Sequence, residues 1–167
     1  MEYLFWIVIT IVIFIIQTQV DFLNQPLNIT TVLVFVFGIK NIVKNPHVKG
    51  YWSGKGEIKS ALFGAIVGLI EDGLSNSIIG PSLLSKALIG FASAYIFTEI
   101  FFRWTSLTVA SVLALLTVFD SIVIVSLRVL MTTIKINTFL FYEMLLIQVV
   151  TNMIIGFLVK LNREEIQ

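Results

Sequence analysis

Two adjacent carboxylates and one lysine lie within apolar segments of this chain, and their side chains are of types that can take part in chemistry. Glu71 and Asp72 lie near the end of an apolar stretch at 59–76, and Lys86 lies early in the next one, at 82–102. A charged side chain at the centre of a membrane helix costs at least about 2.5–3.5 kcal/mol. Each of these groups therefore needs a partner, water or a proton.

The first of these stretches carries a stripe of small residues. Gly64, Gly68, Asp72 and Ser75 are spaced by four, four and three residues, so they share one face of a helix. Small residues let a neighbouring helix come close, and we expect Asp72 to face protein rather than lipid. Glu71 points about 100° away around the helix, so position alone does not join the two carboxylates in one task.

A short turn separates Asp72 from Lys86. The turn around 76–81 should bring both side chains to a similar depth, and Lys86 shares a helix face with Gly90 and Ser93. Two interpretations follow. The one we favour is an ion pair between Asp72 and Lys86 that locks the third and fourth helices together. The other is a site for a ligand or a partner.

Further polar residues lie in the last two apolar stretches. Gln148 and Asn152 are four residues apart and share a face, with Gly156 one turn beyond. Amide side chains at such positions most often form hydrogen bonds to a neighbouring helix. Asp120 lies inside the fifth stretch, and Glu143 lies near the outer start of the sixth.

The residue inventory argues against an enzyme. The chain has no cysteine and one histidine, His47, so thiolate, histidine-pair and cysteine-ligated metal chemistry are excluded. The segment Gly50–Gly56 faintly resembles a phosphate loop, but it has one residue too few between its glycines and lacks the Ser or Thr that holds magnesium. An acid cluster acting on lipid remains as the enzymatic interpretation. We expect no catalytic residue, metal or cofactor.

Composition defines the elements that position these groups. Of 167 residues, 57% are hydrophobic and 13% are charged, whereas a soluble domain carries about 25% charged residues. These proportions exclude a water-soluble globule and a disordered chain. The net charge of +1 argues against nucleic acid as a partner. Membrane-spanning helices are predicted at about 3–20, 29–43, 59–76, 82–102, 105–127 and 137–159.

Residues 1–167 are therefore predicted to form a single all-α membrane domain, a compact bundle of six transmembrane helices. Eight Lys and Arg residues fall on one side of this arrangement and two on the other. The more basic side, which includes the loop 44–58, should be cytoplasmic. Both termini are then cytoplasmic, and the loop is expected to lie on anionic membrane lipid.

At the third helix the chain resembles the bacterial rod shape-determining protein MreD family. The resemblance begins with Gly64, Gly68 and Asp72, continues through Leu74-Ser75, Gly80, Leu83-Leu84 and Gly90, and extends to Gln17, Gln148 and Asn152. It covers nearly the whole chain. Glu71, Pro81 and Lys86 depart from the family pattern.

The resemblance implies a non-enzymatic subunit of the bacterial cell-elongation machinery in the cytoplasmic membrane. Such a subunit binds an MreC-like protein and, through it, the MreB filament, a RodA-type glycosyltransferase and a penicillin-binding transpeptidase, and so supports peptidoglycan synthesis and cell shape. The implied fold is similar to the S components of energy-coupling-factor transporters. Taken together, the helix spacing and the resemblance give these candidate contacts between helices or with a partner: Gly64, Gly68, Asp72, Ser75, Gly80, Lys86, Gly90, Gln148 and Asn152.

The alternative function is a substrate-binding S component of a vitamin transporter, which would share this fold. It predicts an outward pocket of aromatic and polar residues. It also predicts a small-residue face on the first helix for docking to the transporter's membrane subunit. Residues 3–16 contain neither alanine nor glycine, which counts against this alternative.

Overall fold

The computed structural model describes residues 2–19, 21–22, 25–26, 28–44, 55–75, 78–97, 105–132 and 137–159. The predicted cytoplasmic loop falls mostly outside them, as do Arg103, Lys160 and Arg163. The described part contains six helices, as predicted: α1 Glu2–Gln19, α2 Ile29–Lys44, α3 Lys55–Leu74, α4 Pro81–Tyr95, α5 Ser106–Met131 and α6 Thr138–Leu158.

The helix bounds follow the apolar stretches with two extensions. The α3 helix begins at Lys55 rather than near 59, and α5 continues to Met131 rather than ending near 127. The added residues of α3 include Lys55 and Glu57, and α5 continues past Arg128. A charged residue ends an apolar stretch in the sequence without ending the helix. A short antiparallel pair, β1 Asp21–Phe22 and β2 Gln25–Pro26, lies between α1 and α2. It was not predicted, because two-residue strands have no periodic signal.

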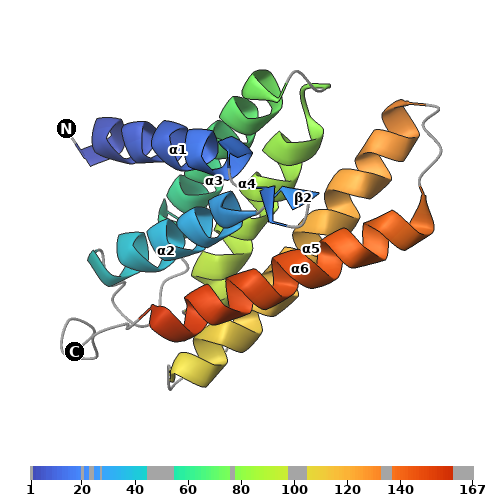
Figure 1. The fold of residues 1–167 in the computed structure, drawn as a ribbon. Coiled ribbons are helices and arrows are strands. Elements are labelled where there is room, and N and C mark those ends of the chain that lie inside the picture. The colour runs from blue at the N-terminus through green and yellow to red at the C-terminus, as the bar shows by residue number, and fades with distance from the viewer. Residues whose placement is uncertain are drawn as a thin grey trace.

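Successive helices run in alternating directions, so α1 begins and α6 ends at the same end of the bundle (Figure 1). The α3 and α4 helices pack along each other, and α2 lies against both of them. The α5 and α6 helices form a hairpin that contacts this group mainly where α5 packs against α4, with smaller contacts to α2 (Figure 1). The molecule thus consists of an α1–α4 body and an α5–α6 hairpin.

Three glycines set the close approach of α3 and α4. A Cβ atom at Gly64 would lie 2.0 Å from the carbonyl oxygen of Lys86, and one at Gly68 would lie 2.2 Å from that of Ser82. A Cβ at Gly90 would lie 2.2 Å from the carbonyl oxygen of Ser60. These distances leave no room for a side chain. The small-residue stripe predicted from the sequence therefore faces the neighbouring helix.

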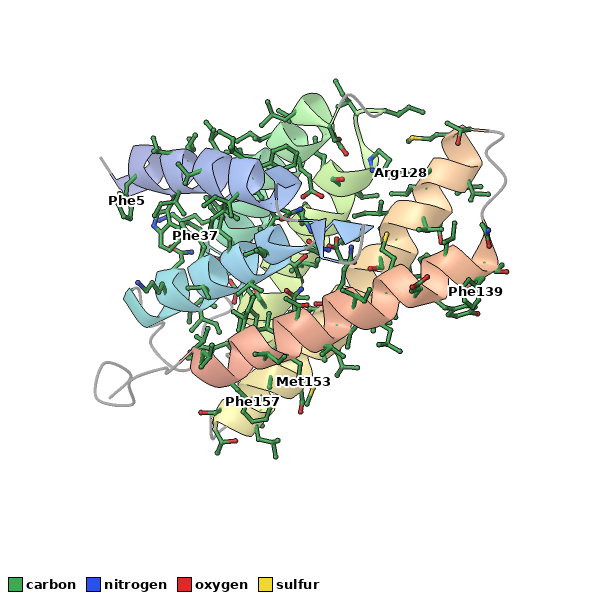
Figure 2. All side chains as sticks on the ribbon, viewed as in Figure 1. Phe5, Phe37, Arg128, Phe139, Met153 and Phe157 are labelled. Carbon is green, nitrogen blue, oxygen red and sulfur yellow. The ribbon has the colours of Figure 1, made fainter. Side chains whose placement is uncertain are left out.

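The bundle has an apolar surface, and its interior holds buried polar groups beside an apolar core. Large apolar side chains are exposed on every helix except α2, and Phe5, Phe139 and Phe157 extend outward in Figure 2. Charged and amide side chains such as Lys86 and Asp120 are fully buried instead. A soluble monomer rarely exposes apolar patches of this extent. Such a surface is compatible with contact with lipid.

Two helices of the described residues, α5 and α6, are long and apolar enough to cross a membrane. Shorter apolar helical segments occur at Phe5–Gln17 and Ile29–Ile42. The charged residues of α3 and the short length of α4 set these helices apart from α5 and α6. The all-helical fold is thus observed, and these features are compatible with a membrane protein.

The glycine contacts predict a clear difference between two conservative substitutions on α3. Gly64→Ala places a methyl group against the Lys86 backbone and should lower the melting temperature of the purified protein in mild detergent. Gly73→Ala is the matched control, because a Cβ there meets nothing within 4 Å. Alanine favours a helix over glycine by about 1 kcal/mol, so the control should melt at the same temperature or higher. Equal melting temperatures for both variants would contradict the close packing.

Candidate functional site

The ammonium group of Lys86 lies at the centre of a buried polar network. Lys86 is completely buried, and its Nζ donates to Asn28 Oδ1 at 2.9 Å and to Thr31 Oγ1 at 2.7 Å. It forms an ion pair with the carboxylate of Asp120 on α5. Glu71 on α3 lies farther away, with Oε2 at 3.8 Å from Nζ. The lysine thereby joins α2, α3, α4 and α5.

Asp120 is the most fully paired carboxylate of this network. Its oxygens accept hydrogen bonds from Lys86, from Ser85 Oγ, from Asn28 Nδ2 at 2.6 Å and from Thr31 Oγ1 at 2.7 Å. A buried carboxylate is tolerated when it is both paired and hydrogen-bonded. Asp120 meets both conditions, with donors from α2, α4 and the residue preceding α2.

Glu71 occupies the edge of the same network. Its side chain is 16% exposed, and its Oε2 accepts a hydrogen bond from Thr30 Oγ1 at 3.0 Å. The Lys86 ammonium therefore faces one enclosed carboxylate and one at the edge. We call this set the Lys86 network: Asn28, Thr30, Thr31, Glu71, Ser85, Lys86 and Asp120.

Asp72 has a different role from the one predicted. Its carboxylate accepts backbone hydrogen bonds from Gly80 at 2.8 Å and from Ser82 and Leu83 at 3.2 Å each. It therefore caps the start of α4, where helix N–H groups lack partners and a negative charge is favourable. The predicted Asp72–Lys86 ion pair is wrong, because Lys86 pairs with Asp120 and Glu71.

Glu71 and Asp72 are adjacent in the sequence, and helix geometry explains why Glu71 lies near Lys86 while Asp72 caps α4. Consecutive helix residues point about 100° apart. Glu71 reaches Thr30 on α2, whereas Asp72 reaches the backbone at the start of α4. The expected divergence of the two carboxylates is confirmed. Of these two neighbours, Glu71 rather than Asp72 lies near Lys86.

Two further predicted site residues, Ser75 and Gly80, lie beside this cap, between α3 and α4. Gly80 has a φ of +133°, a conformation that side-chain-bearing residues rarely adopt, and its N–H points to Asp72. Pro81 follows at the first position of α4, where a missing N–H costs nothing. Ser75 is exposed and donates its hydroxyl to the carbonyl oxygen of Asp72 at 3.3 Å.

On α6, Gln148 and Asn152 make the contacts with other segments that their shared face predicts. Gln148 accepts a hydrogen bond from Ser121 Oγ at 3.2 Å. Asn152 donates to the carbonyl oxygen of Asn28 at 3.0 Å and to Thr117 Oγ1 at 2.9 Å. These contacts attach α6 to α5 and to the residue preceding α2.

Sequence reasoning missed the polar residues at the start of α2. Asn28 and Thr31 complete the Lys86 network, and Gln17 of α1 accepts backbone hydrogen bonds from Ile29 at 3.1 Å and Thr30 at 3.4 Å. Gln17 thus caps α2 from another helix. The sequence showed these residues only as polar positions near the ends of apolar stretches. Their spacing did not indicate that their side chains are in contact.

The Lys86 network has the chemistry of a helix-joining contact. Its donors and acceptors are largely satisfied by one another, and they come from four separate segments. Among the described residues, no three His, Asp or Glu side chains are grouped so as to hold a metal ion.

Comparisons of the chain with protein-family models, with curated proteins and with solved structures find no match.

The geometry predicts which carboxylate is energetically coupled to Lys86. In a double-mutant cycle, the free-energy costs of Lys86→Met and Asp120→Asn should be non-additive by about 1 kcal/mol or more, because the residues are in contact. Lys86→Met and Asp72→Asn, the matched pair, should be additive within about 0.5 kcal/mol. Unfolding in detergent measures both cycles. Stronger coupling of Lys86 to Asp72 than to Asp120 would contradict this geometry and support the Asp72–Lys86 ion pair predicted from the sequence.

Proposed function

We propose that this chain is a multi-pass membrane protein with six transmembrane helices and acts as a non-enzymatic structural subunit. The observation that carries the proposal is an apolar surface around a buried polar network. Exposed apolar side chains such as Leu115, Leu130 and Phe139 surround a buried Lys86 network. Buried polar residues hold membrane helices together, since lipid gives no hydrophobic drive for helix association.

Its partner in this proposal is an MreC-like protein within the bacterial cell-elongation complex. The support is the ordered set of residues shared with the MreD family. Several of them have structural roles: Gly64 and Gly68 at a helix contact, Asp72 at a helix cap, and Asn152 in a contact between segments. The lipid-facing sides of the helices, which carry the exposed apolar residues, would remain available for a partner helix.

Affinity purification tests this function. The tagged chain is isolated from its own membranes in mild detergent, and co-purifying proteins are identified by mass spectrometry. An MreC-like protein and wall-synthesis enzymes are expected, and the untagged strain is the control. Recovery of a transporter's membrane subunit with paired ATPases would instead favour the vitamin-transporter alternative.

Labelling of introduced cysteines tests the proposed orientation. The chain has no cysteine, so each single substitution gives one reactive site. Ile58 and Ile79 are exposed residues near opposite ends of α3. A membrane-impermeant maleimide should label Ile79→Cys in intact cells and Ile58→Cys after permeabilisation alone. Equal labelling of both sites in intact cells would contradict a membrane-spanning α3.

A further inference from the structure

The α5–α6 hairpin is buried against the α1–α4 body over only part of its length. The buried residues of α5 end at Ser121, and those of α6 are Gln148, Asn152 and Gly156. Within the described residues, none of 122–131 or 138–147 is buried. Beyond these buried residues, Met131 at the end of α5 approaches Gly80, where an added Cβ would lie 3.7 Å from the Met131 Cε. The buried part of the attachment therefore lies in the half of the hairpin nearest the start of α5.

The attachment combines a set of polar contacts with apolar ones. The Asp120 carboxylate receives Lys86 and Ser85 from α4 and Thr31 from α2. Asn152 adds a hydrogen bond to the carbonyl oxygen of Asn28. On the apolar side, α5 contributes four residues to the core that it shares with α2 and α4: Val109, Val112, Leu113 and Leu116. Separation of the hairpin would therefore remove the principal counter-ion of a buried ammonium group.

Glu71 provides a second counter-ion from within the body itself. Glu71 lies on α3 and Lys86 on α4, and these helices are held backbone to backbone at Gly64, Gly68 and Gly90. The 3.8 Å between Glu71 Oε2 and Lys86 Nζ does not depend on the position of the hairpin. If the hairpin moves away, Lys86 keeps a carboxylate beside it.

We propose that the α5–α6 hairpin is a separable unit whose docking is controlled by the Lys86–Asp120 ion pair, with Glu71 as the reserve counter-ion. In the docked state Lys86 pairs with Asp120, as in this structure. In the separated state the ammonium turns to Glu71, so neither state leaves a buried positive charge unpaired. The device goes beyond the proposed scaffold function and does not depend on the identity of any partner.

Charge-removing variants test the reserve role of Glu71. Asp120→Asn and Glu71→Gln each leave Lys86 one carboxylate, so folded protein in the membrane should persist. The double variant leaves Lys86 unpaired, and folded protein should fall at least ten-fold below either single variant. Adding Lys86→Met to the double variant should restore it. Glu71→Gln with Glu143→Gln is the matched control, since Glu143 is exposed on α6, and its level should equal that of Glu71→Gln alone.

Three outcomes of this series would overturn the reserve role. The first is a double variant with as much folded protein as Asp120→Asn alone. The second is an Asp120→Asn variant whose folded protein is already as low as that of the double variant. The third is a triple variant in which Lys86→Met does not restore the folded protein.

Spin-label distances test the separation directly. Cysteines introduced at exposed Leu62 on α3 and Leu130 near the end of α5 report the distance between body and hairpin. Leu62 with Leu84 on α4 is the control pair within the body. In lipid vesicles, Asp120→Asn should shift the first pair toward longer distances and leave the control pair unchanged. An unchanged first pair, or an equal shift in both pairs, would overturn the proposal.

Discussion

A positive charge in the interior of an apolar bundle is the constraint on which this structure depends. Lys86 is completely buried, so its ammonium group requires a counter-ion and hydrogen-bond acceptors. The structure supplies them from α2, α3 and α5, which must meet at one point around α4. Breaking a buried ion pair by removing one partner typically costs about 3–5 kcal/mol. The Lys86 network therefore links the hairpin to the body more specifically than the surrounding apolar contacts do.

Much of the fold could be predicted from the sequence, because long apolar stretches leave few alternatives to helices. The number of helices, their approximate bounds and the small-residue contact between α3 and α4 all follow from hydropathy and from the spacing of Gly64 and Gly68. The extension of α3 to Lys55 did not follow, because charged residues beyond an apolar stretch carry no periodic signal. The β1–β2 pair was also unpredicted.

The candidate site was less predictable, since it joins residues distant in the chain. The turn between α3 and α4 suggested Asp72 as the partner of Lys86, and proximity along the chain favoured that pairing. Asp120 lies 34 residues beyond Lys86, and Asn28 lies 58 residues before it. Their approach depends on how α5 and α2 pack against α4, which no local pattern reveals. Asp72 is instead taken up by the free N–H groups at the start of α4.

The most direct test of this account is a solid-state NMR measurement of the dipolar coupling between the ¹⁵N-labelled Lys86 side chain and ¹³C-labelled aspartate carboxyl groups. The protein would be measured in lipid bilayers. The account predicts a strong coupling that disappears in the Asp120→Asn variant and persists in Asp72→Asn. A coupling that instead persists in Asp120→Asn and disappears in Asp72→Asn would contradict it.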